Sequence, residues 1–167
     1  GRGRRRAARE RAARERVARL EAALAELPAV RETKDTAEKR EQARVSSTDP
    51  AARVMKMPDG GFRPAHNVQF ATDTGTQVIT GVDVVNTGSD QGQMAPMVEQ
   101  HEARYEQVPQ DMLVDGGFAK KSDIEQVSSA GVTVYAPVQK PRKAEHDPYA
   151  RRPGDSDAIA AWRERMA

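Results

Sequence analysis

The feature that most constrains this chain is a strand, a helix and a second strand in direct succession in its C-terminal half. The apolar run at residues 112–114 has the composition of a buried strand, and the β-branched run at 132–138 has that of another. Between them, Ser122 and Glu125 have the spacing of a capping box, and Gly131 follows the helix that this box would open. This order predicts strands of one sheet joined by a packed helix.

The preceding segment predicts three more strands. Residues 53–57 and 62–70 flank a Pro-Asp-Gly-Gly turn, and Asp-Gly supplies the positive φ angles that hairpins need. A second turn at 73–76 leads into a strand at 77–85, which completes an antiparallel meander. With the later strands and helices, the meander indicates the mixed α/β fold class.

A helix is expected between the meander and the later strands. Ser89 or Asp90 can cap it, and Pro96 is tolerated because it lies near the first turn. Pro109 closes it. Its inward face is predicted to hold Met94, Met97, Val98, His101 and Tyr105.

The N-terminal segment predicts a long arginine-rich helix, because no glycine or proline occurs from Arg4 to Leu27. Pro28 is expected to end it. We therefore divide the chain into a basic amphipathic helix (1–30), a linker (31–50), a mixed α/β core (51–138) and a basic loop with a C-terminal helix (139–167). One stripe of the first helix is apolar, and it either packs on its own domain or binds a partner helix: Ala13, Val17, Leu20, Leu24 and Leu27.

Charge is distributed unevenly. The first twenty residues hold nine arginines and two glutamates, a local charge of +7, so the remainder carries −5. Two interpretations of the basic segment stay open. The arginines can neutralise DNA phosphates, or they can pair within the helix, since Glu10 and Glu15 each stand four residues before an arginine.

Composition excludes several classes of protein. Without cysteine there is neither a disulfide framework nor a cysteine-ligated zinc site. No apolar run approaches the roughly 20 residues that cross a bilayer, and no secretory signal is present. We expect a soluble, cytoplasmic protein with no membrane partner. A chain that begins at Gly1 and ends in an amphipathic run is expected to be a fragment.

Residues 112–118 hold the most informative local motif, an apolar run followed by Asp115, Gly116 and Gly117. The carboxyl end of a buried strand is where open α/β sheets bind ligands, so Asp115 is a candidate ligand of a hard cation. The alternative is that Asp115 only caps the next turn. Nucleotide-hydrolysing proteins have a similar magnesium-holding strand, but their Gly-x-x-x-x-Gly-Lys loop does not occur here.

Four segments follow one another in a characteristic order: His66-Asn67-Val68-Gln69-Phe70-Ala71-Thr72-Asp73, Val78-Ile79-Thr80-Gly81-Val82-Asp83-Val84, Asp90 with its helix, and Leu113-Val114-Asp115-Gly116-Gly117-Phe118. This set resembles the bacterial insertion-sequence transposases of the DDE class. In that family a Tyr-Asn-x-Gln-x-x-x-Asp hairpin precedes a helix and an Ala-Asp-x-Gly-Tyr strand end. Here His66 replaces the tyrosine and Phe118 the second aromatic residue. The resemblance covers about residues 45–140.

The resemblance implies a ribonuclease-H-like fold, present in part, and three carboxylates that hold two Mg²⁺ or Mn²⁺ ions. One ion activates water or a DNA 3′-hydroxyl group, and the other stabilises the leaving oxygen. Asp115 matches the second carboxylate and is the predicted catalytic and metal-binding residue. The first belongs to an Asp-Gly-Thr strand and the third to a Tyr-x-x-Arg-x-x-x-Glu helix, and neither motif occurs in this sequence. Glu164 lacks the context of the third.

The missing first strand has a structural consequence. In ribonuclease-H-like sheets it lies centrally, between the meander and the strand that ends at Asp115. Without this strand, no backbone hydrogen bonds connect the meander to the strand that ends at Asp115. We therefore expect a fold of marginal stability.

Further candidates surround this motif. Asn67 and Gln69 share a face of their strand and, with Asp73, are expected near the metal, although a turn is an alternative role for Asp73. His101 is expected to be a packed or surface residue, because no second histidine stands four residues away. The candidate DNA-binding residues, for which a solvated surface is the alternative, are Arg4, Arg5, Arg6, Lys140, Arg142, Lys143, Arg151 and Arg152.

Three functions are compatible with these patterns. The first is a fragment of a DNA transposase, a homo-oligomer when intact, which cleaves and joins DNA at transposon ends and is inert alone. The second is a non-catalytic remnant that binds DNA or a full-length subunit through its arginine-rich helix. The third is an interaction module whose apolar stripe pairs with another helix. The sequence does not specify the target site or the terminal repeats.

Overall fold

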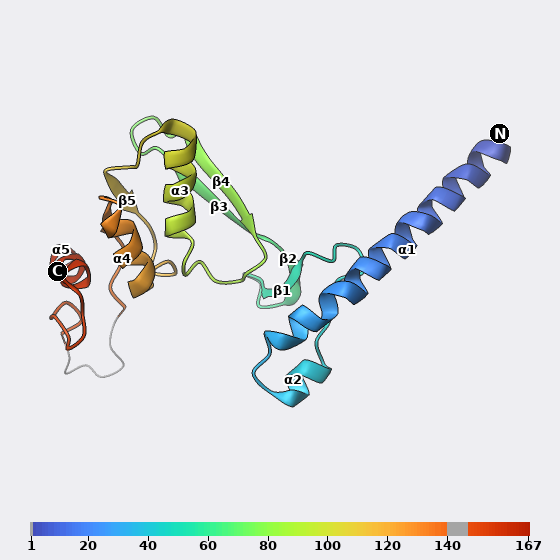
Figure 1. Ribbon diagram of the computed structural model, residues 1–167, viewed down its shortest axis with the longest axis horizontal. Helices are drawn as coiled ribbons and strands as arrows, with labels where there is room; N and C mark the ends of the chain where they lie inside the picture. The colour runs from blue at the N-terminus through green and yellow to red at the C-terminus, as the bar shows by residue number, and fades with distance from the viewer. Residues whose placement is uncertain (1, 140–146) are drawn as a thin grey trace. The chain divides into compact units, whose positions relative to one another are not determined.

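The computed structural model describes residues 2–139 and 147–167 of the chain. The chain forms two compact units, the first made of Gly1–Asn67 with Val85–Gly88 and the second of Val68–Val84 with Ser89–Ala167. Both units contain helices and strands (Figure 1), which gives the mixed α/β class that the sequence predicts.

The first unit begins with helix α1 (Arg2–Glu32), which is longer than predicted. The expectation that Pro28 ends it is wrong, because the helix continues for one more turn. Proline removes one backbone hydrogen bond from a helix, and here the turn beyond it is retained with Val30 buried. The side of α1 that is buried carries Ala23 and Val30, with Leu27 half-buried between them.

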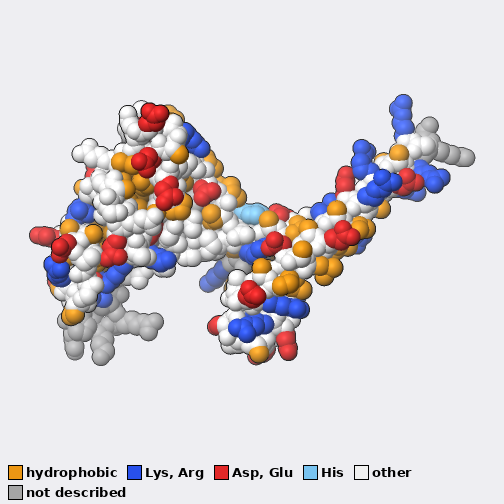
Figure 2. Space-filling model, viewed as in Figure 1, with side chains coloured by type: hydrophobic (Ala, Val, Ile, Leu, Met, Phe, Trp, Pro, Cys, Tyr) orange, Lys and Arg blue, Asp and Glu red, His pale blue; other side chains and the backbone are white. Residues whose placement is uncertain are grey.

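Of the predicted apolar stripe of α1, Leu27 alone lies on that buried side. Val17, Leu20 and Leu24 are all exposed. Figure 2 shows hydrophobic side chains interleaved with Lys and Arg along this helix. The stripe therefore makes no extensive contact within its own unit.

A short helix, α2 (Ala37–Glu41), lies within the segment predicted to be a linker of weak or no order. Thr36 caps it, since its hydroxyl group accepts a hydrogen bond from the backbone N–H of Lys39 at 3.3 Å. Lys39 also pairs with Asp35 at 2.9 Å. The prediction missed this helix because a single capped turn has no hydrophobic periodicity.

The predicted first hairpin is confirmed. Strands β1 (Arg53–Lys56) and β2 (Phe62–Ala65) pair antiparallel, with Arg53 opposite Ala65. Gly60 has the positive φ angle, 81°, that the turn requires. The side chain of Arg53 contacts Glu26 of α1 at 2.7 Å, which ties the hairpin to the helix.

The second unit contains most of strands β3 (Asn67–Thr72) and β4 (Ile79–Val85), which pair in a separate two-stranded sheet. The turn between them is closed by a hydrogen bond from the backbone N–H of Asp73 to the carbonyl group of Val78 at 2.9 Å. The prediction of one continuous meander is therefore wrong in detail. The strand expected from residue 62 to residue 70 is interrupted at His66, so the meander divides into two hairpins.

The predicted strand, helix and strand are confirmed. Strand β5 (Asp111–Leu113) pairs in parallel with β6 (Thr133–Tyr135), and helix α4 (Lys121–Ser129) connects them. Helix α3 (Met94–Tyr105) precedes β5, and helix α5 (Asp157–Arg165) follows β6. The core of the unit lies among these elements: Met94, Ala95, Val98, Ile124, Val127, Val132, Val134, Ala136, Ile159 and Trp162.

Two predicted helix caps are wrong and one is confirmed. Neither Ser89 nor Asp90 caps α3, because the helix starts later, after Gln93. Ser122 does not cap α4, whose N-cap is Lys120 in an extended conformation. The sequence allows Asp155 or Ser156 as the cap of the C-terminal helix, and Ser156 is the one that caps α5, with its hydroxyl group accepting a hydrogen bond from the N–H of Ile159.

The parallel pair β5–β6 and the hairpin β3–β4 are separate sheets in the described part of the chain. This arrangement is consistent with a partial ribonuclease-H-like fold in which the joining strand is missing. Among the described residues, no helix combines the length and the apolar content needed to span a bilayer.

Candidate metal centre

Asp115 lies just beyond the carboxyl end of the parallel strand β5. Strand pairing extends past Leu113, because the N–H of Val114 donates to the carbonyl group of Tyr135 at 2.9 Å. The carboxylate of Asp115 is exposed, and its Oδ1 accepts a hydrogen bond from the N–H of Gly117 at 2.6 Å. Asp115 therefore caps its own turn and also presents a carboxylate at the end of the sheet.

A second carboxylate lies beside the first, at Gly117. A Cβ atom added to Gly117 would lie 2.8 Å from Oδ1 of Asp115 and 3.2 Å from Oδ2 of Asp90. Because both distances are measured from the same point, Oδ1 of Asp115 and Oδ2 of Asp90 cannot be farther apart than the sum of the two. A side chain at position 117 would fill the space on which both carboxylates converge.

Asp90 is held in this position by a buried amide. The side chain of Gln69 on β3 donates from Nε2 to Oδ1 of Asp90 at 2.8 Å. Gln69 is only 7% exposed, and Asp90 is half-buried. A buried hydrogen bond to a carboxylate is stronger than one between neutral groups, so Gln69 restrains the Asp90 side chain.

The chemistry of this pair fits a hard divalent cation. Mg²⁺ prefers oxygen ligands and is often held by only one or two carboxylates together with substrate phosphates. No group of three or more acidic, histidine or cysteine side chains suited to a metal occurs among the described residues. Within the described residues, the pair therefore offers oxygen ligands for only part of such a cation's coordination shell.

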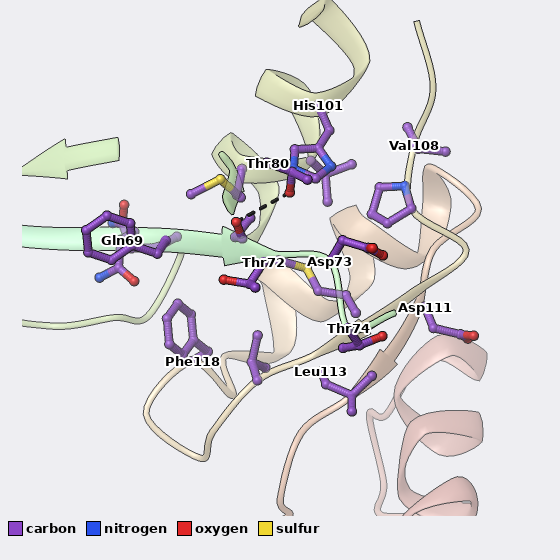
Figure 3. A pocket seen from close by; sticks show the side chains of 18 of the residues that line it. Gln69, Thr72, Asp73, Thr74, Thr80, His101, Val108, Asp111, Leu113 and Phe118 are labelled. Atoms are coloured by element: carbon purple, nitrogen blue, oxygen red, sulfur yellow. Dashed lines mark hydrogen bonds between the residues drawn. The ribbon is translucent and has the colours of Figure 1, made fainter. Parts of the chain in front are cut away.

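A cavity of about 540 Å³ lies beside Gln69 and Val114 (Figure 3), and neither Asp90 nor Asp115 is among the residues that line it. Residues 69–72 of β3 and all of β5 line it, with α3 and Phe118. In Figure 3, Gln69 and Phe118 lie toward one end of the cavity and Asp73 and Asp111 toward the other. The cavity is lined by both β3 and β5. Within the described residues, no further strand pairs with these two strands to join their sheets.

His101 and Asp73 have structural partners. The ring Nε2 atom of His101 lies 3.0 Å from the hydroxyl group of Thr80, which agrees with the predicted packed role. The Asp73 carboxylate accepts hydrogen bonds from the N–H and the hydroxyl group of Thr76, and these bonds lower the pKa of Asp73. Asp73 thus stabilises its turn. Asn67 begins β3 and belongs to the first unit.

The candidate DNA-binding residues divide between three places. Arg4, Arg5 and Arg6 are exposed on α1, and Arg6 pairs with Glu10 at 2.9 Å. Arg151 pairs with the exposed Asp157, and Arg152 is also exposed. The remaining three lie outside the described residues: Lys140, Arg142 and Lys143.

Sequence reasoning identified Asp115 and Gln69 as candidates but took Asp90 as a helix cap. Asp90 instead faces Asp115 across Gly117. The two consecutive glycines after Asp115 could have indicated this approach. One glycine is enough for a tight turn, and the second leaves room for another group to come close to the backbone.

Comparison with known proteins gives one finding. The sequence model of the family described as transposase DDE domain matches residues 32–166. No curated protein matches the chain, and no solved structure does. The match includes both sheets of the second unit and the Asp90–Asp115 pair.

Proposed function

Because the chain belongs to the transposase DDE domain family, we propose that it is part of a DNA transposase in which Asp115 helps to hold a divalent cation against a DNA phosphate. The observation that carries the proposal is the carboxylate of Asp115 at the end of a parallel strand, beside a second carboxylate. Ligands of open α/β sheets bind at such strand ends.

The roles of the chain's own residues follow from these contacts. The N–H of Gly117 holds Asp115 Oδ1, so the carboxylate is oriented before any ligand arrives. Gly117 has no side chain to block the approach of a phosphate. A bound Mg²⁺ or Mn²⁺ would activate the attacking oxygen and stabilise the leaving oxygen of a phosphodiester.

Two of the family's three carboxylates are not matched by a motif in this sequence. We therefore expect no DNA cleavage by this chain alone. The assay is nicking of labelled duplex and supercoiled DNA with Mg²⁺ or Mn²⁺. Nicking that disappears in Asp115→Asn would show that the unmatched carboxylates are dispensable.

The role of Asp115 can be tested without turnover. Fe²⁺ replaces Mg²⁺ at oxygen-rich sites and, with ascorbate and peroxide, generates radicals that cut the nearby backbone. We expect cleavage of the chain close to Gly117 in the wild type, and its loss in Asp115→Asn. Asp111→Asn is the matched control, because Asp111 is an exposed carboxylate at the start of the same strand. Equal cleavage in all three proteins would contradict the metal-binding role.

A second candidate function is DNA binding through α1, which presents Arg4, Arg5 and Arg6 on an exposed surface. Each phosphate contact contributes about −0.9 to the slope of log K against log salt concentration. Replacing these three arginines with glutamine should therefore flatten the slope by up to about three. A slope unchanged by these substitutions but altered by glutamine at Arg151 and Arg152 would assign DNA binding to the C-terminal segment instead.

A further inference from the structure

One face of helix α1 carries large apolar side chains that its own unit leaves in solvent. Val17, Leu20 and Leu24 are 54%, 41% and 69% exposed. They follow one another at spacings of three and four residues, so they form a continuous row along the helix. Apolar side chains scattered singly over a surface are ordinary, whereas a continuous apolar patch is typical of a surface that binds another protein.

Charge is divided between the two halves of the same helix. Residues 1–19 hold nine arginines and two glutamates, a local charge of +7, whereas residues 21–32 hold three glutamates and one arginine, a local charge of −2. A parallel copy of the helix would place the two arginine-rich halves side by side, where they repel. An antiparallel copy would place each arginine-rich half beside the acidic half of the other copy. The helix is therefore complementary in charge to an antiparallel copy of itself.

The apolar row defines a register for such a pair. In an antiparallel arrangement, Leu20 can lie opposite Val17 of the second copy, with a two-fold axis between them. The same register brings Leu24 opposite Ala13 of the second copy, and Ala13 is also exposed. Apolar side chains then meet over about two heptads, in the manner of a short coiled coil.

Two oppositely charged residues flank this row on one side. Arg14 and Glu21 are exposed, each follows an apolar position of the row by one residue, and they lie seven residues apart. A separation of seven residues is close to two helical turns, so both side chains leave the helix in nearly the same direction. When two such helices run antiparallel, this flank of one copy faces the same flank of the other. Arg14 of each copy then lies opposite Glu21 of the other.

We propose that α1 is a self-association surface on which two copies of this chain pair antiparallel, with the apolar row at the centre and two Arg14–Glu21 ion pairs beside it. Exposed ion pairs contribute little affinity, so the apolar row supplies most of the stability and the ion pairs select the direction of pairing. The surface lies on α1 alone, and the inference is therefore independent of a cation at Asp115.

Sedimentation equilibrium of the whole chain over a range of concentrations tests the surface. The mass of the wild type should rise from that of a monomer to that of a dimer. Leu20→Glu should remain monomeric, because it places a charge at the centre of the apolar row. Ala22→Glu is the matched control, since it adds the same charge on the opposite side of the helix and should leave association unchanged. A wild type that is monomeric up to about 1 mM, or equal association of the two variants, would overturn the proposal.

Charge reversal tests the direction of pairing. Arg14→Glu and Glu21→Arg should each weaken self-association by about tenfold, because both ion pairs become repulsive contacts. The double variant has the net charge of the wild type and restores opposite charges across an antiparallel contact, so its affinity should return to within about threefold of the wild-type value. Arg11→Glu, the control on the far side of the helix, should change association little. A double variant as weak as the single ones would overturn the antiparallel arrangement.

The same measurements separate self-association from DNA binding by the arginine-rich half of α1. Pairing through the apolar row should occur without DNA and should persist at about 0.5 M salt, where interactions between exposed charges are screened. Association that appears only after duplex DNA is added, and disappears in high salt, would mean that phosphates bring the copies together. That result would overturn the proposal.

Discussion

The carboxylate of Asp123 on α4 accepts hydrogen bonds from the N–H of Met94 at the start of α3, at 3.1 Å. Its other oxygen accepts from the next N–H, that of Ala95, at 3.0 Å. Asp123 therefore caps a helix that has no side-chain cap of its own. This contact joins α3 to α4, and Met94 lies four residues after Asp90 in the sequence.

Replacing Asp123 with alanine should destabilise the second unit by about 2 kcal/mol, because two buried N–H groups lose their acceptor. Urea unfolding followed by the fluorescence of the single tryptophan, Trp162, measures this loss. Asp157→Ala is the control, since its side chain is 95% exposed. Equal stability of the two variants would show that the cap contributes nothing.

Asp155 should make stability depend on pH at acidic values. A hydrogen bond from Lys121 lowers the pKa of Asp155 far below its usual 3.8, burial opposes this shift, and Arg163 adds to it. A carboxyl group with a depressed pKa in the folded state stabilises the fold above its unfolded-state pKa. That contribution disappears as the pH falls through the folded-state value.

The melting temperature of Asp155→Asn should therefore be several degrees below that of the wild type at pH 6. The difference should shrink as the pH falls below 3.8. Thermal melts of both proteins across this range provide the measurement. A difference that stays constant with pH would mean that the ionised form of Asp155 has no special role.

Ile159 should be among the most sensitive core positions, because it is fully buried where α5 packs on the core. Ile159→Ala should cost about 3 kcal/mol of unfolding free energy, from lost burial and the cavity left behind. Glu164→Ala, an exposed change on the same helix, should cost less than about 0.5 kcal/mol. Chemical denaturation of the two variants tests this difference.

Amide hydrogen exchange should be uneven across the second unit. The amides of α4 and β6 lie in or beside the buried cluster, whereas Phe70 on β3 and Ile79 on β4 are exposed. Local opening is easier where few apolar contacts are buried. Exchange in β3 and β4 should therefore be faster than in β6. Equal protection of both sheets would contradict the marginal fold that the missing strand predicts.

The strand, helix and strand around Asp115 were predictable from the sequence because each has a local signal. An apolar run ends in Asp115, and Gly131, with a φ angle of 86°, follows α4. Ser156 was recognisable as a cap for the same reason, since its partner lies three residues away. Patterns of this kind depend only on neighbours in the chain.

The contacts that join distant segments were not predictable. Asp123 lies within α4, and nothing near it in the sequence indicates a bond to Met94, 29 residues away. Asp90 resembled a cap because serine and aspartate commonly precede helices. Its approach to Gly117 depends on how β5 and α3 pack, which no local pattern records.

The central claim is that Asp115 is a ligand of a divalent cation, and a crystal of the chain soaked in Mn²⁺ tests it most directly. The account predicts an anomalous difference peak beside the Asp115 carboxylate, on the side of Gly117. A map with no peak there, although Mn²⁺ is bound elsewhere in the crystal, would contradict it.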